Sequence, residues 1–201
     1  MIDIYNFPLL EMLLYSFAMV ASPGPINIAI VSSVNQAGMR PTIPLILSAP
    51  IGTALQILLL AIGLGQIFQI YPIVQEVILY VGSAYLLHLA YKICKSSISE
   101  NHKFKPVSIL QGIFIGFSNP KSFIKNGLAI GLFTPLDNYI QGVIIFIVIN
   151  VFVCIISNSV WAIIGKAVLL WLRSPSQKRL FNGFLAFFIV NIVIWMNSPI
   201  I

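Results

Sequence analysis

Long apolar runs alternate with short polar segments along the whole chain. Six of these runs have roughly the 20 residues that a helix needs to cross the hydrocarbon core of a bilayer, and they cover residues 8–33, 42–68, 72–91, 107–133, 139–165 and 180–199. Strands are disfavoured, because apolar residues do not alternate with polar ones as the strands of a barrel require. The pattern predicts an all-α integral membrane protein with six transmembrane helices.

The composition agrees with a surface that faces lipid. Of the 201 residues, 59% are hydrophobic and 8% are charged, whereas a soluble domain has about 25% charged residues. A net charge of +6 could suggest nucleic acid, but the basic residues lie in short loops, where they orient membrane insertion. Cys94 and Cys154 are far apart and form no disulfide or metal-ligand pattern. We therefore expect no nucleic acid, no metal and no cofactor.

The basic residues lie on one side of the predicted spans. Nine of the eleven fall in or beside the first, third and fifth loops, namely Arg40, Lys92, Lys95, Lys103, Lys105, Lys166, Arg173, Lys178 and Arg179. The second and fourth loops contain none. Because loops rich in lysine and arginine stay in the cytoplasm, we expect the N-terminus and the C-terminus to lie outside.

Three spans in each half of the chain require opposite insertion of the two halves, if the halves are related. We therefore interpret residues 1–96 and 107–201 as inverted three-helix halves, joined by a basic cytoplasmic connector at residues 97–106. Turn-forming residues 22–25 interrupt the first helix, and residues 118–121 interrupt the fourth. Broken helices at matching positions of inverted repeats indicate a transport site near the middle of the membrane.

The first of these breaks is the sequence Pro23, Gly24 and Pro25. A proline inside a helix costs about 3 kcal/mol, so two of them around a glycine predict an unwound or sharply kinked stretch. Its freed carbonyls need partners at membrane depth, which a polar cavity or a substrate can supply. A static kink that only shapes helix packing is the alternative. Asn119 and Pro120 form the corresponding break in the fourth helix.

Lys121 follows the second break directly and is too deep to reach the membrane surface easily. A charge at this depth costs at least about 2.5–3.5 kcal/mol on insertion scales, so Lys121 should face the interior of the bundle or a wet cavity. There it could bind the carboxylate of a substrate. Lys125 lies one turn further along the same face, and we interpret it as a structural ion near the outer rim, paired with Glu11 or Glu76.

Two further groups of residues point inward by their spacing. Gly112 and Gly116 are four residues apart and form a seam that lets another helix approach closely. A broad polar face of the fifth helix, which either lines a pathway or joins helices, contains Asn150, Cys154, Ser157, Asn158 and Trp161. The sequence contains no nucleotide-binding loop, no metal cluster and no nucleophile with a base, so we do not expect an enzyme.

Several motifs, in this order, resemble the LysE/RhtB family of bacterial amino-acid exporters. They are Ser22-Pro23-Gly24-Pro25, Gly38-Met39-Arg40, Gly82-Ser83-Ala84-Tyr85-Leu86-Leu87 leading to Lys92, and Gly112 followed by Asn119-Pro120-Lys121. The resemblance covers nearly the whole chain. It implies six helices, efflux of amino acids or similar metabolites, and coupling to the proton gradient.

The chain departs from the pattern of that family at two places. The family often has Gly-Asp in the second helix, where this sequence has Gly52 and Thr53. After Asn-Pro-Lys, the family usually continues with aromatic residues, where this chain has Lys125 and Asn126. The missing acid leaves proton coupling without its usual residue, and the substrate preference of the family is not carried over.

These features favour a secondary transporter that exports amino acids or similar small metabolites across the bacterial inner membrane. The substrate would be held near the midplane between the broken first and fourth helices. Lys121 would bind its carboxylate, and carbonyls near Gly24 or Asn150 would accept from its amine. The expected partners are this small molecule, the lipid bilayer and, in a homodimer, a second copy. The alternative is a membrane-embedded binding or assembly partner, derived from an exporter, that does not transport.

Overall fold

The computed structural model describes residues 7–64, 70–96, 107–172 and 174–197, and every regular element within them is helical. The first half of the chain contains α1 (Leu9–Ala21), α2 (Pro25–Ala37), α3 (Met39–Leu59), the π-helical turn η2 (Leu60–Leu64) and α5 (Pro72–Ser96). The second half contains α6 (Ile109–Phe117), α7 (Pro120–Phe133), the 3-10 turn η3 (Leu136–Asn138), α8 (Tyr139–Trp171) and α9 (Pro175–Asn197). The all-α fold is confirmed over these residues.

Apolar length identifies the helices that can cross a bilayer. Three segments within the described residues qualify singly, and they are Met39–Gly63, Tyr139–Val168 and Pro175–Ile194. A fourth span results if α1 and α2 are taken together, because they form one apolar stretch bent by 55° at its break. The helix therefore breaks where two prolines and a glycine predicted it.

Helices α3 and α9 begin several residues before the apolar runs that predicted them. Helix α3 begins at Met39 because Gly38, with φ 89°, turns the chain there, and it continues through Pro44 and Pro50. Membrane helices tolerate such prolines because neighbouring groups satisfy the freed carbonyls. Helix α9 begins at Pro175, five residues before the predicted start, because its first turn is polar. Ser174 and Gln177 cap that turn reciprocally, with bonds of 3.0 and 3.2 Å.

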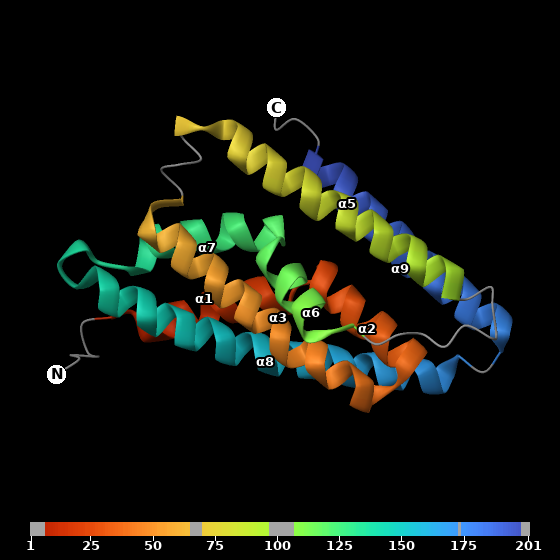
Figure 1. Ribbon diagram of the computed structural model, residues 1–201. Coiled ribbons are helices and arrows are strands. Elements are labelled where there is room, and N and C mark those ends of the chain that lie inside the picture. The colour runs from red at the N-terminus through yellow and green to blue at the C-terminus, as the bar shows by residue number, and fades with distance from the viewer. Residues whose placement is uncertain (1–6, 65–69, 97–106, 173, 198–201) are drawn as a thin grey trace.

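The helices run side by side along an elongated molecule, with α5 and α9 paired along one edge (Figure 1). Helices α1, α2, α3, α6 and α8 pack against one another in the remaining body. The larger apolar cluster, called here the inner cluster, is built mainly from α2, α3, α5 and α9. The smaller one, called here the outer plug, consists of Met12, Ile57, Ala129, Ile130 and Phe146. Both names follow the orientation that the sequence predicts.

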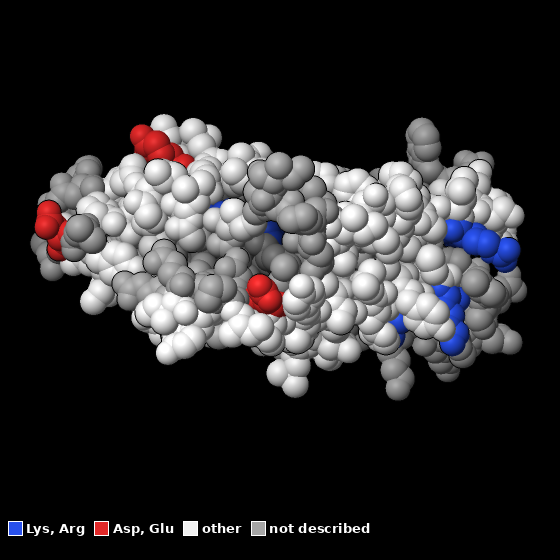
Figure 2. All heavy atoms as spheres, turned by 90° about the horizontal axis from the view of Figure 1, so that it is seen from above, with Lys and Arg blue, Asp and Glu red and all other residues white. Residues whose placement is uncertain are grey.

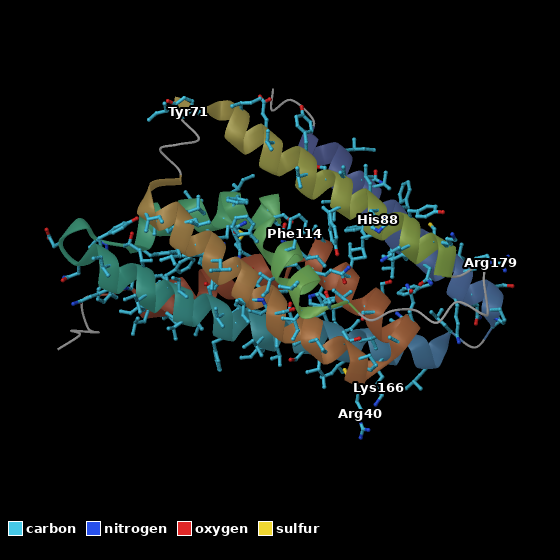
Figure 3. All side chains as sticks on the ribbon, in the orientation of Figure 1. Arg40, Tyr71, His88, Phe114, Lys166 and Arg179 are labelled. Atoms are coloured by element: carbon cyan, nitrogen blue, oxygen red, sulfur yellow. The ribbon has the colours of Figure 1, made fainter. Side chains whose placement is uncertain are left out.

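Charge is unevenly distributed along the molecule. Figure 2 shows most of the visible lysine and arginine atoms at one end and two small areas of them toward the middle, with the described acidic side chains toward the other end and the middle. Arg40, Lys166 and Arg179 lie toward the basic end of the helices in Figure 3. Such a separation is the polarity that membrane insertion imposes on a chain with basic cytoplasmic loops.

Candidate functional site

A pocket lies where the two helix breaks meet. Its walls come from α1, α2, α3, α7 and α8, and its polar lining consists of Ser22, Asn27, Thr53, Asn119, Lys121, Ser122, Lys125, Cys154 and Asn158. About 30 Å³ of the pocket is open to the centres of water molecules, and one water needs about 10–15 Å³. The pocket has room for water, and it must open to take a metabolite.

The pocket lies between the two apolar clusters, as the order of residues along three helices shows. In α1 and α2, Met12 of the outer plug precedes the break and Ile28 of the inner cluster follows it. In α3, pocket residue Thr53 lies between Ala49 of the inner cluster and Ile57 of the outer plug. In α8, Phe146 of the outer plug precedes pocket residue Cys154, and Ala162 of the inner cluster follows it. An apolar cluster therefore lies on each side of the pocket along the helices.

Side chains satisfy the carbonyls that the first break frees. Asn27 Nδ2 donates to the carbonyl oxygens of Val20, at 3.3 Å, and Ser22, at 2.9 Å. From α8, Trp161 Nε1 donates to the Ala21 carbonyl at 3.2 Å. Because hydrocarbon offers no water to these groups, the bonds make an interrupted helix tolerable at membrane depth.

Lys121 joins the two breaks directly. Its Nζ donates to the Ser22 carbonyl at 3.0 Å, the Ser22 hydroxyl at 2.6 Å and the Pro23 carbonyl at 3.2 Å. The end of α1 carries the partial negative charge of a helix C-terminus, which the ammonium compensates. Gly24 lies beside the same side chain, since a Cβ built on it would be 3.5 Å from Nζ. The structure thus brings Lys121 together with residues 22–24.

Gln56 of α3 satisfies the carbonyls of the second break. Its Nε2 donates to the carbonyls of Phe117, at 2.7 Å, and Asn119, at 3.3 Å, while its Oε1 accepts from Asn126 Nδ2 at 2.9 Å. Gln56 is fully buried. The sequence analysis missed Gln56 and Asn27, although a buried amide in an apolar helix was a signal for each.

We expect Gln56→Leu to destabilise the protein by about 2–4 kcal/mol, because leucine leaves the Phe117 carbonyl and the Asn126 amide without this partner, at a cost of about 1–3 kcal/mol for each buried group. The Asn119 carbonyl keeps its bonds from two backbone N–H groups of α7. Thermal unfolding in detergent measures the loss. Gln141 of α8 is a matched control, because it lies in the first turn near the end of its helix and is only half-buried. An equal fall in unfolding temperature for Gln56→Leu and Gln141→Leu would contradict the role of Gln56 at the second break.

The interpretation of Lys125 as a rim ion paired with Glu11 or Glu76 was wrong. Lys125 is 6% exposed and lines the pocket, whereas both glutamates are exposed. Within the described residues, its ammonium has neither a hydrogen bond nor a salt bridge. The spacing placed Lys125 on the correct face of α7, but the packing of the other helices buries the side chain at the pocket.

The remaining predicted site residues occupy different positions. Pro25 and Pro120 are the first residues of α2 and α7. Asn119 lines the pocket, and its buried Oδ1 has no partner. Asn150 is 1% exposed and accepts a bond from Cys154 Sγ at 3.5 Å, but it lies outside the pocket lining.

Among the described residues, the pocket lining contains no acid. Thr53 stands where an aspartate was expected from the resemblance, and its hydroxyl donates to the Ala49 carbonyl at 3.2 Å. The part of the chain that the structure describes also has no group of three or more His, Cys, Asp or Glu side chains that could hold a metal ion. The charge of the pocket is therefore that of its two lysines.

Three glycines let α3 and α6 approach closely beside the pocket. A Cβ on Gly52 would collide with the Ile113 carbonyl, one on Gly116 with the Ala49 carbonyl, and one on Gly112 with the Ser48 side chain. The close approach sets the position of α6, which ends at the second break. It therefore determines whether Gln56 can reach the carbonyls of that break.

An all-helical membrane protein whose polar pocket lies between two broken helices has the construction of a secondary transporter. Residues 17–195 match the family described as the LysE type translocator, and the chain belongs to this family. It is therefore a transporter and not an enzyme.

Curated relatives are similar over most of their length. The chain is 30% identical over 158 residues to a protein named cysteine/O-acetylserine efflux protein from Salmonella typhimurium, covering 75% of this chain and 78% of that protein. The protein of the same name from Escherichia coli K12 is 26% identical over 153 residues, with 75% and 78% covered. No solved structure matches the chain.

Proposed function

We propose that the protein exports amino acids or similar small metabolites across the bacterial inner membrane and holds its substrate in the pocket between the two breaks. The observation that carries the proposal is the contact between Lys121 and residues 22–23, which joins two interrupted helices at one polar cavity. The names of the curated relatives, which are efflux proteins for cysteine and O-acetylserine, support the direction and the substrate class.

The proposed topology is six spans in two inverted halves, residues 1–96 and 107–201, with a cytoplasmic connector at 97–106 and both termini outside. Six runs result when α1 joins α2, α3 joins η2 and α6 joins α7. The two breaks are built alike, which supports the repeat. In each, a serine hydroxyl donates to the preceding turn, from Ser22 to Met19 at 2.9 Å and from Ser118 to Phe114 at 2.6 Å.

Transport in this scheme depends on Lys121 exchanging partners. In the closed pocket, its ammonium holds the end of α1 against the start of α7. A substrate carboxylate that binds Lys121 would replace the carbonyls of Ser22 and Pro23 as acceptor, because bonds between two ions are stronger than bonds to neutral oxygens. The tie between the halves would weaken, and the outer plug could open toward the exterior.

A metabolite comparison tests the export itself. We expect medium from cells that express the protein to accumulate at least one small amino acid or related metabolite several-fold above medium from cells with an empty vector. Feeding the cells dipeptides should raise their internal amino-acid pools and enlarge the difference between the two media. A membrane-embedded partner that does not transport would leave the two media equal for every metabolite, at matched amounts of inserted protein.

A further inference from the structure

The pocket carries two positive charges that no described acid balances. Lys121 and Lys125 lie one turn apart on the same face of α7 and both line the pocket, so they repel each other. Neither forms a salt bridge in the described ranges, where Glu11, Glu76 and Asp137 are all exposed. Buried charges in proteins are normally paired, because an unpaired ion out of water is costly. The pocket therefore lacks negative charge.

The backbone carbonyls at the two breaks, which could hold a substrate amine, are already occupied. Bonds from Asn27, Trp161 and Lys121 satisfy the carbonyls of residues 20–23. Gln56 satisfies the carbonyls at positions 117 and 119. An entering ammonium group would have to displace these internal donors one by one.

Donors, in contrast, remain available at the pocket. Lys125 is buried, lines the pocket and has no hydrogen-bond partner among the described residues. Helices α2 and α7 both begin at the pocket, and neither N-cap makes a side-chain capping bond. The positive ends of α2 and α7 thus lie at the pocket, while the negative ends of α1 and α6 at the same breaks are already bonded by Lys121 and Gln56. The Oδ1 of Asn119, which has no partner, is an acceptor at the pocket that suits a neutral N–H or O–H.

We propose that the transported molecule is a small carboxylate with a net charge of −1, held between Lys121 and Lys125. This class comprises hydroxy acids, N-acylated amino acids and amino acids with a second carboxylate. The inference rests on the proposed function, because it takes the pocket to be the site of the transported molecule. A monoanionic substrate differs from cysteine and O-acetylserine, the zwitterions in the names of the curated relatives.

Two isomers provide a sharp test. N-acetyl-L-serine is a monoanion and O-acetyl-L-serine a zwitterion at mildly acidic pH, although they have the same atoms. We expect the purified full chain, reconstituted in liposomes, to exchange N-acetyl-L-serine at concentrations at least about tenfold lower than O-acetyl-L-serine, the effect of one additional bond to a charged group. L-Lactate and L-glutamate, which are also monoanions, should compete, whereas L-serine and L-cysteine should compete weakly.

Variants of Lys125 assign the preference to the pocket. Lys125→Met should lower the apparent affinity for N-acetyl-L-serine by roughly 10- to 100-fold and remove the preference over its isomer. Lys125→Arg should retain the preference. Lys166→Met is the matched control, because Lys166 is exposed on α8 at the basic end and lies outside the pocket. Lys166→Met should leave the exchange of both isomers unchanged.

The outcomes separate this inference from the proposed function. Exchange of O-acetyl-L-serine or cysteine at least as good as that of the monoanions would overturn the inference and leave an exporter of zwitterions. A preference that survives Lys125→Met would overturn it as well. If liposomes exchanged none of these anions or zwitterions, both the inference and the proposed export of small metabolites would be rejected.

Discussion

Replacing Lys121 by methionine should lower efflux at least about 100-fold, to near the level of cells that lack the protein. Methionine keeps the apolar stem and removes the ammonium, which in our proposal binds the substrate carboxylate in place of the acceptors at the end of α1. Hydrogen bonds to a charged group contribute about 1.5–3 kcal/mol each, and about 3 kcal/mol corresponds to roughly 100-fold. The fall in efflux is measured with cells that are preloaded with the metabolite identified by the comparison of media.

Controls must separate a lost contact from a lost protein. The amount of Lys121→Met in the membrane is compared with wild type, and its elution from a sizing column in detergent shows whether it is folded. Lys166→Met, which removes an exposed lysine from α8, should export normally. Wild-type efflux by Lys121→Met at an equal amount of folded protein would exclude Lys121 from the mechanism.

The helices and their breaks could be predicted from the sequence because each depends on local properties. Hydropathy determines where the chain can lie in lipid, and the prolines at positions 23, 25 and 120 interrupt hydrogen bonding within a few residues. The position of Lys121 followed from its depth alone, since an ion in the middle of a membrane helix has to face the interior.

The partners across the helices could not be predicted, because they depend on how far one helix slides along another. Gln56 reaches the second break only because α3 and α6 meet at a particular register, which their glycines permit. Lys125 was misplaced for a similar reason. Its face on α7 followed from the spacing, but its burial depends on the side chains of other helices that line the pocket with it.

Thr53 shows how the two kinds of information combine. The sequence alone revealed that an expected acid is missing, and the structure shows that the residue in its place lines the pocket. The described lining contains two lysines and no acid. The missing aspartate therefore changes the sign of the charge that the pocket can bind. Proton coupling through an aspartate in this pocket is therefore replaced by a requirement for an anionic occupant in our proposal.

Gly116→Ala should cause a large loss of folded protein. The added Cβ would collide with the backbone carbonyl of Ala49, which cannot rotate away as a side chain can, so α6 would have to move away from α3. Overpacking costs about 1–3 kcal/mol and occasionally more, and we expect at least the upper end of that range. The movement would also separate Gln56 from the Phe117 carbonyl, so efflux should fall with stability.

The same substitution at Gly127 should have the opposite sign. Gly127 is exposed in α7, and a Cβ there would meet no heavy atom within 4 Å, so alanine should stabilise the helix by about 0.5–1 kcal/mol. Unfolding temperatures in detergent, measured from the protein that remains monodisperse after heating, compare the two variants with wild type. Equal stability of Gly116→Ala and Gly127→Ala would mean that α3 and α6 do not meet at this seam, and the register that brings Gln56 to the second break would have to be abandoned.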